Sequence, residues 1–219
     1  TELSPLGTLC TLKNKHLKLP AQEQMKIRLK QGRAIFGIDM KIVNDAGQDQ
    51  PHDGKAYGDL LVRGPWVVAE YFKNEGGTPL VKDTHGQSWF PTGDVATIDA
   101  DGYMQITDRS KDVIKSGGEW ISSIDIENIA VAHPAVAMAA CIGVAHPKWD
   151  ERPIVVVVKK PDAQVTREEL LKFYEGKTAK WQIPDDVVFV DAIPLGATGK
   201  MLKTRLREQL KDYKLERTE

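Results

Sequence analysis

The pattern of apolar and turn-forming residues changes near Arg109, and this change limits the folds that the chain can adopt. Before it, apolar residues that alternate at 38–42, 58–63 and 88–109 predict strands joined by turns, as in part of a barrel or sandwich. After it, strand-like segments alternate with helical ones, which is typical of a compact α/β layer. We therefore predict an α+β fold with two domains, residues 1–108 and 109–219.

Local signals place several elements within this outline. A helix over residues 19–32 is expected to follow Pro20 and to end at Gly32. In the second domain a tight hairpin bends at residues 117–118, and Ser122 caps a helix that runs to about residue 132. Thr166 and Glu169 form a capping box for a helix over 167–176. The last helix is expected at 203–213.

The composition argues against several classes of function. The chain has 30 basic and 31 acidic side chains and a formal net charge of -1, so its overall charge does not favour nucleic acid or an anionic membrane. The apolar runs, such as residues 154–158, are far too short to span a bilayer. Two isolated cysteines favour a reduced, cytoplasmic setting. The five histidines have no metal-ligand spacing.

The stretch IPLGATGKML, residues 193–202, carries Lys200 on a loop of small residues. A phosphate-binding P-loop needs a glycine five positions before Gly199 and a Ser or Thr after the lysine, but Pro194 and Met201 occupy those positions. A lysine on such a loop can instead neutralise negative charge that develops on oxygen. The alternative is an ordinary surface lysine before a helix.

Two further stretches combine glycine with charge. In PTGDV, Asp94 follows a Thr-Gly turn, where its carboxylate could accept two hydrogen bonds from a ribose diol or could simply close the turn. The stretch DRSKDVIKSGGEW brings Arg109, Lys111 and Lys115 together. If residues 112–115 form a strand, Lys111 and Lys115 point the same way, and the glycines that follow allow close approach of another molecule. The alternative is a solvated hairpin with surface lysines.

Five motifs in order give the chain a family resemblance over essentially its whole length. The chain resembles the C-terminal portion of AMP-forming acyl-CoA synthetases, of the adenylate-forming superfamily, and is most similar to those for medium- and long-chain fatty acids. The motifs are TEL, YGDLLVRGPWVVAEYF, WFPTGDV, DRSKDVIKSGGEWISSIDIE and IPLGATGKML. The departures from the family pattern are Asp59 for Glu, Glu70 for Gly, Phe90-Pro91 for Tyr-Arg, and Leu195-Gly196 for Lys-Thr or Arg-Thr.

The resemblance implies an architecture and a reaction. Residues 1–108 would be the barrel-like C-terminal part of a large, mostly β domain, and residues 109–219 a small α/β lid domain. A carboxylic acid and ATP would give an acyl-adenylate and pyrophosphate, with Mg²⁺ as cofactor. The lid would then rotate, and the acyl group would pass to the thiol of coenzyme A.

The resemblance also implies roles for individual residues. Lys200 would bridge the substrate carboxylate and the α-phosphate as the catalytic lysine of adenylation, and Asp94 with Arg109 would hold the ribose hydroxyls. Glu2 would help to hold Mg²⁺, and Thr1 would touch the phosphate.

The remaining implied roles belong to the thioester step. Lys111 would be the hinge of the lid. The hairpin with Gly117 and Gly118 would leave room for the pantetheine arm of coenzyme A, with Lys115 and Trp120 beside it.

Other interpretations stay open. The family's own phosphate-binding loop does not occur in the sequence, so we expect a fragment that is inactive alone. Aryl or other acyl substrates, and a silent binding or scaffold homologue, are alternatives to fatty acyl activation. Nucleic-acid binding is rejected because no basic stripe supports it. The sequence is compatible with oligomerisation and with peripheral membrane association.

Overall fold

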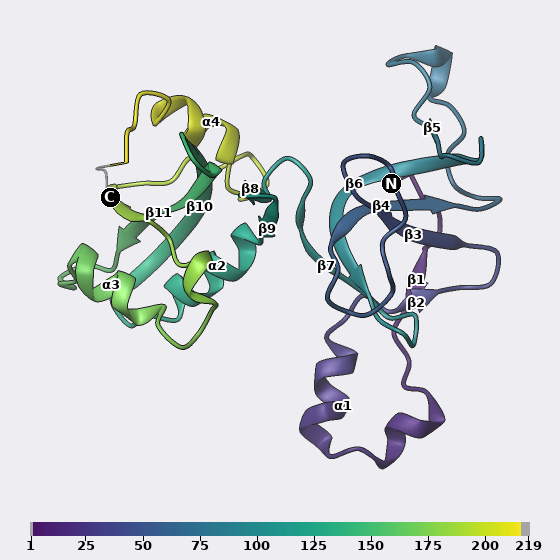
Figure 1. Cartoon of the computed structure of the whole chain (residues 1–219), viewed down its shortest axis with the longest axis horizontal. Coiled ribbons are helices and arrows are strands. Elements are labelled where there is room, and N and C mark those ends of the chain that lie inside the picture. The colour runs from purple at the N-terminus through teal and green to yellow at the C-terminus, as the bar shows by residue number, and fades with distance from the viewer. Residues whose placement is uncertain (1, 216–219) are drawn as a thin grey trace. The chain divides into compact units, whose positions relative to one another are not determined.

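Residues 2–215 are described by the computed structural model, and they divide between Lys111 and Asp112 into two units (Figure 1). The predicted second domain begins at residue 109, which is the last residue of strand β7, whereas the second unit begins at Asp112. The α+β class is confirmed, and the sheets of the described residues are open rather than closed into a barrel.

The first unit is built mainly from antiparallel strands. Its five-stranded sheet has the order β3-β4-β6-β5, with β7 added alongside β6, and a separate pair joins β1 to β2. The elements are β1 (Thr8–Leu9), the short 3₁₀ helix η1 (Asn14–Lys18), α1 (Ala21–Arg28), β2 (Arg33–Ala34), β3 (Asp39–Val43), β4 (Gly58–Arg63), η2 (Phe72–Asn74), β5 (Val81–Lys82), β6 (Ser88–Ile98) and β7 (Met104–Arg109).

The core of the first unit lies on one face of this sheet. Alternate residues of a strand point to one face, so Leu60 and Val62 of β4 lie together with Ile42 of β3. Ala96 and Ile98 of β6 complete the apolar layer, and the side chain of Ile42 is fully buried there.

The second unit alternates strands and helices. Its sheet has the order β10-β11-β8-β9, and β12 pairs with β11 in parallel. The elements are β8 (Ile114–Ser116), β9 (Glu119–Ile121), α2 (Ser123–Val131), β10 (Val136–His146), β11 (Asp150–Lys159), α3 (Arg167–Phe173), the 3₁₀ helix η3 (Lys180–Gln182), β12 (Asp186–Phe189) and α4 (Lys203–Gln209).

Strand β11 separates two apolar layers in the second unit. Val155 and Val157 belong to the cluster that also holds residues of α2 and α3. Ile154 and Val156 point to the opposite face, where Leu206 of α4 packs. The uninterrupted apolar run VVVV is therefore explained by a strand that is buried on both faces.

The predicted helix signals are largely confirmed. Ser122 caps α2 by accepting a hydrogen bond from the Asp125 amide at 3.1 Å, and Thr166 and Glu169 form the capping box of α3. The predicted ends were too late, because α1 stops at Arg28, α3 at Phe173 and α4 at Gln209. β8 begins at Ile114 rather than at residue 112, so Lys111 and Lys115 do not share a strand.

Candidate active-site elements

Asp94 and Arg109 lie opposite each other on neighbouring strands of the first unit. They are register partners in the β6–β7 pair, and Arg109 Nη1 is 2.8 Å from Asp94 Oδ1. The Arg109 side chain is 54% exposed and that of Asp94 is 17% exposed. The pair thus presents a carboxylate acceptor beside a guanidinium donor at the surface, and a vicinal diol could hydrogen-bond to both.

A β-bulge decides which residue faces Asp94. Near the turn the register is regular, with Ala96 opposite Ile106, but it shifts by one residue before Val95, which lies opposite Asp108. Without this shift Asp94 would face Asp108 instead of Arg109, and two like charges would lie side by side. The extra residue is Thr107, whose hydroxyl donates to the Val95 carbonyl at 3.2 Å. The bulge therefore creates the acid–base pair.

Local bonds hold the segment before Asp94 in place. The Thr92 hydroxyl donates to the Leu60 carbonyl at 3.1 Å and accepts from the Asp94 amide at 3.2 Å. Gly93 has a φ of 74°, which an L side chain rarely adopts. The order Thr-Gly-Asp thus produces an irregularity within β6 that fixes the backbone of Asp94.

Lys200 lies on a short turn in the second unit. The Gly199 amide donates to the Gly196 carbonyl at 2.9 Å, and the Gly196 amide donates to the Lys200 carbonyl at 2.8 Å. Ile193 before the turn and Leu206 after it are buried in the same apolar cluster. The Lys200 side chain is exposed, and within residues 2–215 no hydrogen bond or ion pair is recorded for it. A hydrogen-bonded turn therefore carries an exposed ammonium group.

The predicted hairpin is present and brings Lys115 to Trp120. The two residues are register partners in the β8–β9 pair, and Lys115 Nζ lies 5.0 Å from the centre of the indole ring. Gly117 and Gly118 form the bend, with φ values of 59° and 85°. A Cβ atom on Gly118 would meet no atom within 4 Å, so one side of the bend is open to another molecule.

A cavity beside this hairpin was missed by the sequence interpretation. Its volume is about 630 Å³, and its walls include Gly117, Trp149, Trp181 and Arg152. The two indoles are 41% and 44% exposed, which is unusual for such large apolar side chains. The signal in the sequence was that each tryptophan follows a lysine, in PKWD and AKWQ.

Arg152 fixes the wall of this cavity. Its guanidinium donates to the Asp185 carboxylate at 2.6 Å, to the Ser116 hydroxyl at 3.1 Å and to the Trp181 carbonyl at 2.7 Å. Its side chain is only 12% exposed. Arg152 therefore holds the β8 end, the β11 strand and the η3 helix together, so the cavity is preformed.

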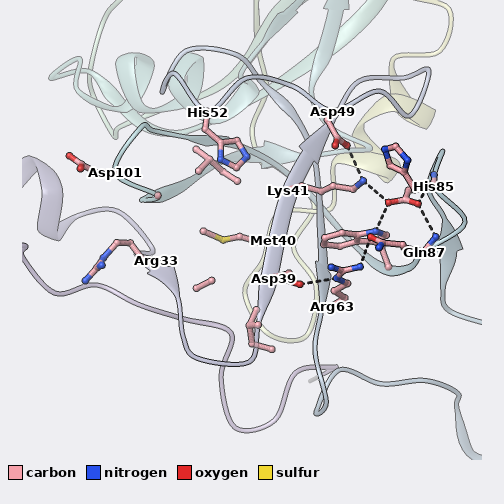
Figure 2. A pocket seen from close by; sticks show the side chains of 16 residues that line it. Arg33, Asp39, Met40, Lys41, Asp49, His52, Arg63, His85, Gln87 and Asp101 are labelled. Atoms are coloured by element: carbon pink, nitrogen blue, oxygen red, sulfur yellow. Dashed lines mark hydrogen bonds and ion pairs between the residues drawn. The ribbon is translucent and has the colours of Figure 1, made fainter.

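A second cavity, of about 560 Å³, lies in the first unit (Figure 2). Charged side chains line it, but they pair with one another: Lys41 Nζ is 2.9 Å from both Asp83 and Asp49. The hydrogen bond from Lys41 and those from Trp89 and two backbone amides lower the pKa of the Asp83 carboxyl well below its usual range. No predicted site residue lines this cavity, and we interpret it as a network that supports the sheet.

The remaining predicted site residues are placed as follows. Lys111 is exposed, in the turn between β7 and β8. Glu2 is partly buried, and its carbonyl accepts from the Val68 amide at 2.9 Å. Thr1 lies outside the described residues. Within residues 2–215 no group of three or more His, Cys, Asp or Glu side chains is arranged to hold a metal ion. None of the helices described there is long and apolar enough to cross a membrane.

Sequence comparison relates the chain to enzymes that join acids to coenzyme A. Residues 125–200 match the family model of the AMP-binding enzyme C-terminal domain. The chain is 59% identical over 212 residues to the 3-methylmercaptopropionyl-CoA ligase of Ruegeria lacuscaerulensis, covering 97% of this chain but only 38% of that enzyme. It is 48% identical to the medium-chain-fatty-acid–CoA ligase of Ectopseudomonas oleovorans, again covering 98% of this chain and 38% of the relative.

Structural comparison agrees with this relationship. The ATP-bound MatB of Rhodopseudomonas palustris superposes with a TM-score of 0.71 at 32% identity. The match covers 84% of this chain and 36% of MatB. The chain thus corresponds to the C-terminal part of these longer proteins.

Proposed function

The chain is a homologue of the C-terminal part of AMP-forming acyl-CoA ligases, and on this premise we propose that it serves ATP-dependent activation of a carboxylic acid to its coenzyme A thioester. The observation that carries the proposal is the Asp94–Arg109 pair, with its 2.8 Å contact across β6 and β7. A partly exposed carboxylate beside an exposed guanidinium on the neighbouring strand suits the two hydroxyls of a nucleotide ribose.

In the first half-reaction the substrate carboxylate attacks the α-phosphorus of ATP, and pyrophosphate leaves. Negative charge develops on the oxygens around that phosphorus, and the Lys200 ammonium group stabilises it. Lys200 lies on a turn whose backbone is held by hydrogen bonds. Its long side chain can therefore extend to the reacting oxygens while the backbone stays in place. Glu2 would supply a carboxylate to the Mg²⁺ that accompanies ATP, since Mg²⁺ prefers oxygen ligands and shares them with phosphates. Thr1 is proposed to contact the phosphate.

In the second half-reaction the thiol of coenzyme A attacks the acyl carbonyl, and AMP leaves. The open side of the hairpin at Gly118 gives the pantetheine arm room, and Lys115 and Trp120 lie beside it. We assign the cavity of Trp149 and Trp181 to the nucleotide end of coenzyme A, because an exposed indole can stack on an adenine ring.

For the acid, we propose an aliphatic substrate. The predicted class was medium- or long-chain fatty acids, and the relatives extend it to a short thioether acid, since the ligase named for 3-methylmercaptopropionate is the more similar at 59% against 48% identity. Aryl acids remain the alternative within the family. The alternative outside this activity is a binding or scaffold homologue that keeps the fold but has lost the catalytic function.

The first test is ATP–pyrophosphate exchange by the full-length protein, scanned over straight-chain, thioether and aryl carboxylic acids. Exchange that peaks with one acid would support the activity and name the substrate. Absence of exchange with every acid would favour a binding or scaffold homologue.

The Asp94–Arg109 pair can be tested with a matched pair of variants. Asp94→Asn should raise KM for ATP by about 10- to 100-fold, because hydrogen bonds to a charged acceptor contribute about 1.5–3 kcal/mol. Asp39→Asn is the control, since Asp39 also faces an arginine, Arg63, across two strands of the same unit. Equal effects of both variants on KM would contradict the assignment.

The indole cavity is tested separately. Trp149→Ala should raise KM for coenzyme A by about 5- to 100-fold, since stacking on a base contributes about 1–3 kcal/mol, and should leave pyrophosphate exchange unchanged. Trp149→Phe keeps an aromatic face and should recover most of the loss. If Ala and Phe variants were equally impaired, or if exchange fell in parallel, the cavity would not be the coenzyme A site.

A further inference from the structure

Residues 13–31 form a segment that differs in charge from the rest of the chain. It holds six Lys or Arg residues and one Glu, a formal charge of +5, whereas the whole chain has -1. We call it the basic arm. It contains η1 and α1, and Figure 1 shows these helices extending away from the strands of the first unit. None of the residues of α1 is buried.

The base of the basic arm is tied to the turn between β6 and β7. The buried His16 ring lies 3.2 Å from the Asp101 carboxylate and 3.3 Å from the Tyr103 hydroxyl. At the C-terminal end of the arm, Lys30 Nζ is 2.7 Å from the Asp99 carboxylate. Lys13 and Lys15 also pair with Asp101. These contacts orient the arm, but they use only the cations nearest the sheet.

The outer part of the basic arm exposes large apolar side chains. Leu17 is 58% exposed, Met25 56% and Leu29 73%. Met25 and Leu29 are four residues apart, so they share one face of α1. Gln24 and Ile27 are half-buried on the opposite side of α1, and the Gln24 side-chain amide donates to the Leu17 and Leu19 carbonyls.

Cations flank this apolar face. On an α-helix, residues 26 and 28 lie on either side of the stripe made by residues 25 and 29. Lys26 pairs with Glu23 at 2.7 Å. Arg28 and Lys18 are exposed, and in the part of the chain that the structure describes no ion pair is recorded for either side chain. The outer part of the arm therefore combines exposed apolar side chains with cations that no ion pair among the described residues neutralises.

We propose that the basic arm docks on a membrane surface that contains anionic lipids. Met25 and Leu29 enter the boundary between headgroups and acyl chains, while Arg28 and Lys18 contact lipid phosphates. The inference does not depend on the proposed ligase activity, because vesicle binding tests it without ATP or acid. The near-neutral charge of the whole chain does not prevent this binding. Salt screens charges that lie more than about a Debye length away, so the lipid phosphates are attracted by the cations of the arm itself.

The exposed Met25 and Leu29 favour a lipid surface over two other kinds of partner. A nucleic acid would be attracted by the same cations, but burying Met25 and Leu29 would not contribute to binding a phosphate backbone. A second copy of the chain would bury the apolar face, but it would bring the basic residues of two arms together. Both alternatives give distinct results in the experiment below.

The experiment is co-sedimentation of the 219-residue chain with vesicles of phosphatidylcholine, with and without phosphatidylglycerol. We expect binding only to the anionic vesicles, and weaker binding at about 0.5 M salt than at about 0.1 M, because salt screens the attraction. Lys18→Gln with Arg28→Gln should lower the partition coefficient about 25-fold, at about fivefold for each cation. Met25→Gln with Leu29→Gln should lower it roughly tenfold or more.

Matched controls lie elsewhere on the first unit. Lys55→Gln with Lys82→Gln removes the same charge, and Phe72→Gln removes an 81% exposed aromatic ring. Neither control should change vesicle binding. The proposal is overturned by absence of binding, by equal binding to both vesicle types, or by equal loss in the controls. It is also overturned if duplex DNA but not vesicles binds the arm, or if the apolar variants only convert a dimer to a monomer.

Discussion

At Lys200 the local fold separates an anchored backbone from a mobile charge. The turn from Gly196 to Gly199 is closed by backbone bonds, and buried residues lie before and after it. The ammonium group extends from this base into solvent. Such a group suits a charge that appears only during the reaction, because it can approach the reacting oxygens and then withdraw.

Replacing Lys200 should separate the two half-reactions. In the full-length protein, Lys200→Ala should slow acyl-adenylate formation by about 10²- to 10³-fold, as the loss of one donor to a developing oxyanion does elsewhere. Transfer of the acyl group from added acyl-adenylate to coenzyme A should keep its rate. Single-turnover measurements of each step check this. Lys211→Ala, another exposed lysine of the same unit, is the control, and equal loss of both steps in Lys200→Ala would contradict the role.

At the scale of elements, the β8–β9 hairpin connects a sheet to a cavity. Gly117 contributes to both, because its amide donates to the Trp149 carbonyl at 2.9 Å and its Cα lies against the indole ring. Gly118, one residue on, faces open space. Two adjacent glycines thus serve different purposes: one allows close packing within the unit, and the other leaves the outer side of the bend accessible.

This difference predicts unequal effects on stability. Both Gly117→Ala and Gly118→Ala place an L residue at positive φ, which costs about 1–2 kcal/mol. A Cβ on Gly117 would also lie 2.7 Å from Trp149 Cε3, a clash that adds about 1–3 kcal/mol. Denaturant unfolding should therefore show a clearly larger loss for Gly117→Ala. Equal losses would mean that Trp149 moves aside without cost.

At the scale of the whole molecule, the chain consists of two units that each have their own apolar core. The connection between them runs through the turn at Lys111, whose side chain is exposed. The residues on either side are anchored, since Ser110 bonds to Asp59 in the first unit and Asp112 pairs with Arg207 in the second, so backbone rotation at Lys111 itself disturbs no core packing. This supports the proposal that Lys111 is the hinge of the lid.

The hinge proposal predicts a selective effect of proline. Lys111→Pro fixes φ near -65° and should slow the thioester step more than adenylation, because the rotation that separates the two steps is restricted. Lys111→Ala removes the same side chain but leaves the backbone mobile, and it should affect both steps little. Separate measurements of the rates of the two half-reactions test this prediction. A proline variant that impairs adenylation more would remove the hinge assignment.

The sequence by itself determined the class of fold and most of its elements. The period-two strands, the capping residues Ser122 and Thr166, and the glycines at 117–118 act within a few residues, so their consequences can be derived locally. The same holds for the order of the motifs, which identified the family. The short strands β1, β2 and β5 were not predicted, because two residues carry too little pattern.

Only the tertiary structure decided which side chains meet. Arg109 faces Asp94 because a bulge at Thr107 shifts the register by one residue. No pattern in the local sequence predicts that shift. The indole cavity forms because Arg152 binds both Ser116 and Asp185, which lie 36 and 33 residues away from it in the sequence. Contacts of this kind depend on how strands pair and pack across long separations in the sequence, so a pattern spanning a few residues does not specify them.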